Sequence, residues 1–168
     1  MMIKIGDRLP DVQFMTLTSE GPKPLKTAEV FSGKKVAIFA VPGAYTPTCH
    51  NQHMPGFLTR ADYLKSKGVD TIACIAVNDV FVMDSWAKAS NASGKILMLT
   101  DDSASFAKAI GLEIDLTGTH LGLGVRSKRY SMLVDNQIVK VLNVDESPPV
   151  HDKSSAEALC KMIDNLIL

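Results

Sequence analysis

Five short apolar runs divide the chain, and their length and composition predict the strands of a buried sheet. Gly, Lys or Asp residues bound these runs, which cover residues 36–41, 71–77, 96–100, 130–134 and 138–144. Three of the runs are nearly all apolar, which is typical of central strands that are covered on both faces. The last two are separated by Asp135 and Asn136, a turn-prone pair, so they predict an antiparallel hairpin.

The stretches between the runs are amphipathic and predict helices over residues 47–67, 80–92, 103–110 and 154–167. Pro55 lies inside the first range, where it removes a hydrogen bond and clashes with the preceding turn, so we expect a kink there. This order of elements predicts an α/β fold with a central mixed β-sheet flanked by helices, and a thioredoxin-like sheet matches it. No repeat or low-complexity linker interrupts the chain, so we expect a single domain over residues 1–168.

The composition and the charge balance bear on whether nucleic acid or a membrane is a partner of this protein. With 168 residues, 46% of them hydrophobic and 21% charged, the chain is typical of a globular protein that buries its own core. Its 18 basic and 18 acidic residues cancel, so no overall field attracts nucleic acid or an anionic membrane. The apolar runs are also far shorter than a membrane span. We therefore expect neither nucleic acid nor a membrane as a partner.

The cysteines and the N-terminus indicate a compartment. Cys49, Cys74 and Cys160 are odd in number and lack the spacing of a disulfide framework, which favours free thiols in a reducing compartment. Residues 1–10 carry charges and contain no apolar run of signal-peptide length. We expect a cytoplasmic protein, or an organellar one if a transit peptide was removed.

Residues 42–49 contain the candidate reactive residue, and the pattern of apolar and polar positions does not account for their composition. It follows a buried strand, and Thr46 is a good helix N-cap before Pro47, the residue favoured at the first helical position. Cys49 is then expected in the first helical turn, where unpaired N–H groups and the helix dipole favour a thiolate. Two interpretations stay open on these residues alone: a reactive cysteine, or a small buried hydrophobe that only packs.

The sequence PGAYTPTC in this segment resembles the peroxiredoxin signature P-x-x-x-T-x-x-C. Its flanks resemble the type 5 (plant type II) subfamily over nearly the whole chain, in the pieces KIGDRLPDV, GKKVAIFAVPGAYTPTC, HMPGFL, LKSKGVD, AVNDVFVMDSW and RSKRYSMLVD. The resemblance implies a thioredoxin-like fold and a thiol-dependent peroxidase. Such an enzyme reduces hydrogen peroxide and small organic hydroperoxides through a sulfenic acid, here on Cys49.

The resemblance also implies partners. An external thiol, supplied by glutathione with glutaredoxin or by thioredoxin, is the expected reductant, and no cofactor is expected. Relatives often form dimers through loops near the active site, which makes a homodimer an expectation here.

Other roles transfer to this chain by position in the resembling segments. Thr46 matches the threonine whose hydroxyl bonds the peroxide and the thiolate, and Pro42 matches the proline that shields the pocket from water. Arg129 matches the arginine whose guanidinium faces the sulfur, a role consistent with the need for preorganised donors at a developing negative charge. Arg126 is shared with many relatives, but a solvated surface arginine is the simpler interpretation, so we rank it as supporting only.

Two residues beside the cysteine depart from the family pattern. His50 stands where relatives commonly have serine, and it either favours the thiolate as an imidazolium or points outward; we favour the second. Tyr45 replaces the usual phenylalanine and adds a hydroxyl at the rim of the pocket. Cys49, His50 and His53 also invite a metal hypothesis, but no second Cys or His pair stands at ligand spacing, so we expect no metal site.

The remaining cysteines decide how a sulfenic acid is resolved. Cys74 lies in an apolar run and is expected to be a buried strand residue, although plant type II relatives have a cysteine here that has been considered a resolving partner. Cys160 is expected in the core, and the C-terminal resolving cysteine of animal members has no clear counterpart over residues 148–155. A redox sensor or holdase that signals through Cys49 is the alternative function. A disulfide oxidoreductase is disfavoured because the chain has no Cys-x-x-Cys pair.

Overall fold

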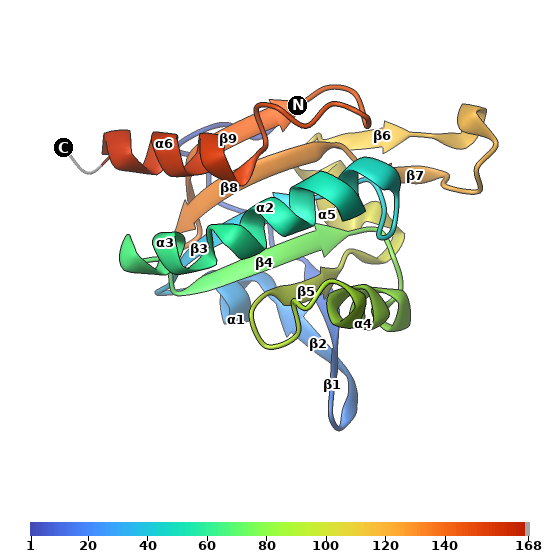
Figure 1. The fold of residues 1–168 in the computed structure, drawn as a ribbon, viewed down its shortest axis with the longest axis horizontal. Coiled ribbons are helices and arrows are strands. Elements are labelled where there is room, and N and C mark those ends of the chain that lie inside the picture. Colours follow the sequence, from blue (N-terminus) through green and yellow to red (C-terminus); the bar gives the residue numbers. More distant parts are fainter. Residues whose placement is uncertain (167–168) are drawn as a thin grey trace.

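The computed structural model describes residues 1–166, and its centre is a seven-stranded mixed sheet (Figure 1). The strands of this sheet are β1 (Gln13–Thr18), β2 (Gly21–Lys26), β3 (Lys35–Ala40), β4 (Thr71–Ala76), β5 (Leu97–Thr100), β8 (Arg129–Asp135) and β9 (Ile138–Asp145). They lie in the order β2-β1-β5-β4-β3-β8-β9. The central strands β3, β4 and β5 are parallel, whereas β1 and β8 join them as antiparallel neighbours. The expected α/β fold with a central mixed sheet is confirmed.

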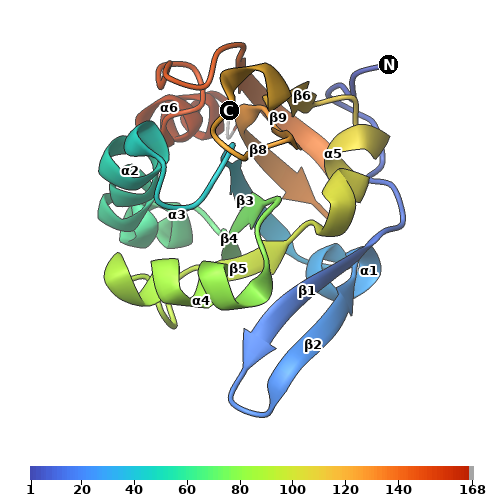
Figure 2. The same ribbon diagram turned by 90° about the vertical axis from the view of Figure 1, so that its right-hand side faces the viewer.

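Helices cover both faces of this sheet, as Figure 2 shows. One face carries α2 (Met54–Thr59), α3 (Ala61–Ser66), α4 (Val80–Ala89) and α6 (Ala156–Leu166). The other face carries α1 (Thr27–Phe31) and α5 (Ser105–Ala109). Because both faces are covered, every residue of β3 and β4 after the first is buried, and this is why their sequences are almost wholly apolar.

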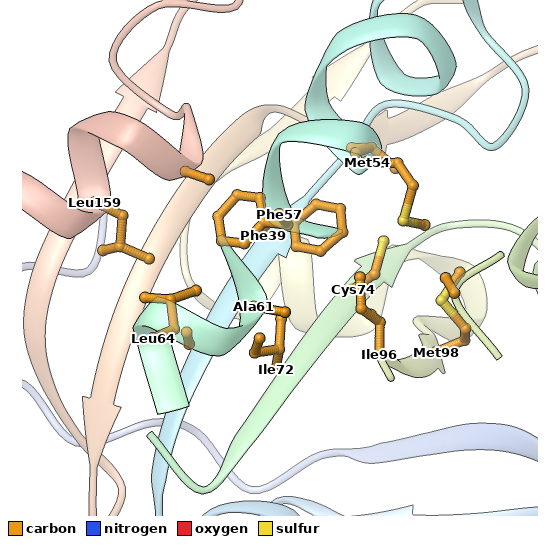
Figure 3. Close-up of a cluster of buried hydrophobic side chains, with 14 of the residues drawn as sticks. Phe39, Met54, Phe57, Ala61, Leu64, Ile72, Cys74, Ile96, Met98 and Leu159 are labelled. Atoms are coloured by element: carbon orange, nitrogen blue, oxygen red, sulfur yellow. The ribbon is translucent and has the colours of Figure 1, made fainter. Parts of the chain in front are cut away.

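The larger of the two cores lies between the sheet and α2, α3, α4 and α6. Phe39 of β3 and Phe57 of α2 stack there with ring centroids 4.3 Å apart and ring planes 12° apart (Figure 3). Cys74 of β4 and Met54 of α2 belong to the same cluster. The packing of α2 against β3 fixes the position of the helix start, and therefore of the functional site that it carries.

The five predicted strands are present within one or two residues, including the β8–β9 hairpin. The β1–β2 hairpin was not predicted, because β2 reads GPKPLK and has no apolar run. Its two prolines are tolerated because β2 is an edge strand, where a missing N–H breaks no ladder bond to a further neighbour. A second short hairpin of β6 (Glu113–Asp115) and β7 (Val125–Ser127) was also missed.

The helix predicted over residues 47–67 begins at Pro47, as expected, but it is not a single kinked helix. Its first part is a π-helical turn, Cys49–His53, in which the Met54 N–H bonds the Cys49 carbonyl. This turn ends two residues before Pro55, which has no N–H for an α-helical bond, so the irregularity lies upstream of the proline. A second interruption at Arg60 (φ −95°, ψ 4°) separates α2 from α3.

The remaining predicted helices correspond to α4, α5 and α6. The last residue of the range expected for the final helix, 167, lies outside the described residues, and α6 begins at Ala156 rather than at residue 154. Within residues 1–166, no helix combines the length and the apolar composition that crossing a membrane requires.

Candidate active site

Cys49 lies in the π-helical turn that follows β3, at the carboxyl end of the parallel strands. Its side chain is completely buried. The preceding loop is held at two points: the Ala44 N–H bonds the Asn78 carboxamide oxygen at 2.9 Å, and the His50 N–H bonds the Thr46 carbonyl at 2.8 Å. Cys49 therefore occupies the start of a helix, as the sequence predicted, in a position that favours an anion.

Arg129, the first residue of β8, reaches the same point from the neighbouring strand. Its guanidinium Nη2 donates to Cys49 Sγ at 3.0 Å, and the whole side chain is 1% exposed. Within residues 1–166 it is the only side chain that hydrogen-bonds this sulfur. A guanidinium only donates hydrogen bonds, so Arg129 directs a buried donor at the sulfur, an arrangement suited to an anion.

Arg129 is itself held by His53, a residue that the sequence suggested only as a possible metal ligand. The Arg129 Nη1 lies 3.1 Å from His53 Nδ1, and His53 Nε2 lies 2.9 Å from the Ser154 carbonyl. A guanidinium only donates, so Nδ1 accepts and the ring proton lies on Nε2, which donates to Ser154. Burial, and then the positive charges of Arg129 and His151, lower the pKa of His53 well below its usual value, which agrees with a neutral ring.

The spacing of His53 was the signal that could have revealed this role. His53 is one helical turn after Cys49, so both side chains are expected on one face of the helix. That face meets β8 and the loop that follows β9, and therefore Arg129.

The loop that follows β9 completes the surroundings of the guanidinium. The Pro148 carbonyl accepts from Arg129 Nε at 3.3 Å and from Nη2 at 2.8 Å. Asp145, which lies opposite Arg129 in the β8–β9 register, holds this loop. Its carboxylate accepts from the backbone N–H groups of Asp152, Lys153 and Ser154 and from the Ser154 hydroxyl, at 2.6 to 3.1 Å.

These bonds keep Asp145 charged although it is buried. Burial alone would raise the pKa of Asp145, but the hydrogen bonds from Ser154 and its neighbours lower it below the usual value. The loop is therefore anchored at its Asp145 end, which places the carbonyls of Pro148 and Ser154 against Arg129 and His53.

Thr46 and Pro42 border the site without bonding the sulfur. The Thr46 hydroxyl donates to the Gly43 carbonyl at 2.7 Å and does not accept from an N–H of the first helical turn. Thr46 therefore precedes the helix, as predicted, but its side chain does not form the capping hydrogen bond. Pro42 is buried, and its carbonyl accepts from Arg126 Nη1 at 3.2 Å. Arg126 Nε also donates to the Leu123 carbonyl at 2.6 Å, so this arginine braces the loop rather than the sulfur.

Tyr45 and His50, the two residues that depart from the family pattern, both contact α4. The prediction that His50 points outward is wrong. The side chain is half-buried, and its Nδ1 accepts from the Trp86 indole N–H at 3.0 Å. Its ring stacks on the ring of Tyr45, with centroids 5.8 Å apart. The Tyr45 hydroxyl lies 2.6 Å from the hydroxyl of Ser85, also on α4.

The other two cysteines are buried and unpaired, as is Cys49. Cys74 lies in the middle of β4, between Phe39 of β3 and Met98 of β5, and burial raises its pKa well above the usual value. Cys160 packs in the core from α6. Cys49 and Arg129 both influence the pKa of Cys74, but among the described residues no side-chain cation hydrogen-bonds Cys74 or Cys160. No group of three or more His, Cys, Asp or Glu within residues 1–166 is placed to hold a metal ion.

Comparisons with known proteins agree with this geometry. Residues 4–160 match the Redoxin family. Peroxiredoxin-2E, chloroplastic, of Arabidopsis thaliana is 43% identical over 96% of this chain and 69% of its own length, and peroxiredoxin-2C of the same plant is 43% identical over 96% and 98%. The crystal structure of reduced Prx3 in complex with H2O2 from Vibrio vulnificus superimposes with a TM-score of 0.90 and 48% identity, over 96% of this chain and 99% of that chain.

Proposed function

Because this chain belongs to the peroxiredoxins of the Redoxin family and is a thiol-dependent peroxidase, we propose that Cys49 is the thiol that attacks the peroxide. One observation carries this proposal: the bond of 3.0 Å between the buried Arg129 guanidinium and Cys49 Sγ, at the start of a helix. Cys74 and Cys160 have no such cation in hydrogen-bond contact among the described residues. Their burial also raises the pKa of each, so both favour the unreactive thiol form.

The first step is a displacement at oxygen. The Cys49 thiolate forms an S–O bond as the O–O bond of the peroxide breaks, and the second oxygen leaves with the electron pair. That oxygen takes a proton and departs as water, or as an alcohol when the substrate is an organic hydroperoxide. Arg129 stabilises first the thiolate and then the negative charge on the departing oxygen.

Pro42 and Thr46 complete the proposed site. Pro42 is buried beside the cysteine loop and limits the access of water. The Thr46 hydroxyl has to turn from the Gly43 carbonyl, which it now bonds, to donate to a bound peroxide. Arg126 supports the site from outside through the Pro42 carbonyl.

Hydrogen peroxide and small organic hydroperoxides are the proposed substrates. The Vibrio vulnificus Prx3 structure, described as a complex with H2O2, supports the first of them. The complete burial of Cys49 supports a small substrate over a bulky one.

We assign the second step to an external thiol, from glutathione with glutaredoxin or from thioredoxin. The thiol attacks the Cys49 sulfenic acid, forms a mixed disulfide and releases water; a second thiol then restores Cys49 and leaves as a disulfide. Cys74 is an unsuitable internal partner because it sits mid-strand with neighbours on both sides, and its raised pKa keeps it protonated. A disulfide needs short Cα separations that two such rigid elements do not reach without backbone movement.

The test compares peroxide consumption by the wild type and by Cys74→Ser, with glutathione plus glutaredoxin and, side by side, with thioredoxin. We expect turnover by the wild type, and we expect Cys74→Ser to keep most of it with glutathione plus glutaredoxin. Mass spectrometry after one equivalent of peroxide, without added thiol, should show Cys49 as sulfenic or more oxidised acid.

Two outcomes would contradict this proposal. A dominant Cys49–Cys74 disulfide would make Cys74 the resolving residue. Stoichiometric oxidation without turnover, with each of the reductants, would instead favour the redox sensor or holdase.

His53 is the positioning residue of this site, since it bonds Arg129 and not the sulfur. Removing both ring nitrogens with His53→Leu takes away the acceptor of Arg129 Nη1 and leaves the guanidinium held by the Pro148 carbonyl alone on its acceptor side. We expect peroxide reduction to slow by about 10- to 100-fold, as small misplacements of a catalytic group do. His53→Asn keeps an acceptor near the position of Nδ1 and should recover part of this loss.

Stopped-flow oxidation at several pH values measures the effect, with His120→Leu, at an exposed site between β6 and β7, as the control. If His53 mattered only for stability, both His53 variants would unfold at a lower temperature than the wild type but would reduce peroxide at the same rate.

A homodimer is the proposed assembly. Three large hydrophobic side chains near the carboxyl end of the parallel strands are exposed, and they are Tyr45, Phe81 and Leu121. Apolar groups at that end are consistent with an interface formed by loops near the site.

We propose the cytoplasm as the compartment, with an organelle as the alternative. The name of the relative peroxiredoxin-2E, which is designated chloroplastic, supports the organellar alternative.

A further inference from the structure

A cavity of about 410 Å³ lies where α4 packs beside β5 and β1 (Figure 2). Its volume is in the range of cavities that hold small molecules. Neither Cys49 nor Arg129 lines it, so it is separate from the site described above. Apolar side chains form much of its lining, among them Ile72, Met83, Ala87, Ile96 and Met98.

One residue that lines this cavity carries a buried hydroxyl group without a partner. Thr100 is 7% exposed, and among the described residues its hydroxyl has no hydrogen-bond partner. A polar group that is buried in this condition destabilises the fold, and a ligand that bonds it removes that cost. Thr100 stands opposite Ala76 in the β4–β5 register, at the carboxyl ends of both strands. This end of the cavity therefore favours a ligand with a hydrogen-bonding group.

Two lysines line the cavity at its opposite end. Lys95 comes two residues before β5, and Lys65 lies in the last turn of α3, shortly before β4. Because β4 and β5 are parallel, both lysines lie at the amino ends of these strands, whereas Thr100 lies at the carboxyl ends. Both lysines are exposed, so the cavity is reached from solvent at this end.

The charges of the lining favour an anion at the lysine end. Among the described residues, neither Lys65 nor Lys95 forms an ion pair. The two acidic side chains of the lining already have partners: Asp84 pairs with Lys88 at 2.8 Å, and Asp70 accepts from the Lys35 N–H at 2.8 Å. The two free ammonium groups are therefore available to a carboxylate.

We propose that this cavity binds a linear apolar carboxylic acid that carries a hydroxyl group at its far end. The carboxylate lies between Lys65 and Lys95, and the apolar chain lies against the buried side chains of α4 and β5. The hydroxyl of the ligand pairs with that of Thr100, since a hydroxyl both donates and accepts. The chain from Lys95 to Thr100 spans at most about 16 Å, which a ligand of about ten carbons matches when the lysine side chains reach inward.

The test compares three ligands by calorimetric titration. The probe is ω-hydroxydecanoate; decanoate lacks its far hydroxyl, and decane-α,ω-diol lacks its carboxylate. We expect the probe to bind about three- to tenfold more tightly than decanoate, the range expected for one hydrogen bond. It should bind at least about twofold more tightly than the diol, the effect of ion pairs with exposed lysines.

Variants assign each preference to its residues. Thr100→Val should abolish the preference for the probe over decanoate, and it should not lower the unfolding temperature, because it removes an unpaired buried hydroxyl. The double variant Lys65→Met, Lys95→Met should abolish the preference over the diol. Ser131→Ala is the control: it removes another buried hydroxyl without a partner among the described residues, on β8 and outside the cavity lining, and should change neither preference.

Failure to bind the probe, or equal binding of the three ligands, would overturn the assignment of this cavity. A preference over decanoate that survives in Thr100→Val, or that is lost in Ser131→Ala, would do the same. The inference is independent of the proposed role of Cys49, so Cys49→Ser should bind all three ligands as the wild type does.

Discussion

Replacement of Cys49 by serine is expected to abolish peroxidase activity, with a loss of at least about 10³-fold, as is common when a nucleophile is removed. A serine hydroxyl is a weak nucleophile unless a base stands beside it. The nearby imidazole cannot serve as that base, because the Nδ1 lone pair of His53 already accepts from Arg129. The rate of peroxide consumption with glutathione and glutaredoxin measures the loss.

Cys160→Ser is the control for this result. Cys160 is a buried cysteine on α6, outside the proposed site, so its replacement should leave the activity near normal. Activity retained in Cys49→Ser, or lost only in Cys160→Ser, would refute the assignment of the nucleophile.

Arg129→Ala is expected to slow peroxide reduction by about 10²-fold or more, the effect of removing one preorganised donor at a developing negative charge. The same change removes the one side-chain donor that faces the sulfur among the described residues. Stopped-flow oxidation by peroxide measures the loss of rate.

A second variant separates charge from geometry. Arg129→Ala also leaves the His53 ring and the Pro148 carbonyl without their donor, and buried groups in that condition reduce the stability of the fold. Arg129→Lys keeps the charge but lacks the fork that reaches Cys49, His53 and Pro148 at once, so its rate should lie between those of the wild type and the alanine variant. An unchanged rate of peroxide reduction in Arg129→Ala would make Arg126 the next candidate.

The sequence predicted those parts of the fold that are encoded locally. The runs that became β3 and β4 are apolar because both faces of these strands are covered. The helix starts at Pro47, a residue type favoured at the first helical position. The edge strand β2 gave no signal, since its side chains are exposed and its ladder bonds go to one neighbour only.

Part of the candidate site was also predictable from the sequence, through the family resemblance. The family resemblance placed Arg129 opposite Cys49, and the structure brings the two together. The spacing of His53 from Cys49 indicated a shared helix face and nothing more, because its partners, Arg129 and the loop that follows β9, are remote in sequence. The partners of His50 and Tyr45 on α4 were hidden for the same reason.

The separation of Cys49 and Arg129 along the chain also has a consequence for synthesis on the ribosome. The two residues are 80 positions apart, and the Pro148 carbonyl that accepts from the arginine follows later still, after β9. A chain that emerges from its N-terminus presents Cys49 long before its cation exists, and β8 has to dock on β3 before the pair can form. The nascent protein therefore carries Cys49 without its guanidinium partner, and the proposed site is complete only when the last third of the chain is in place.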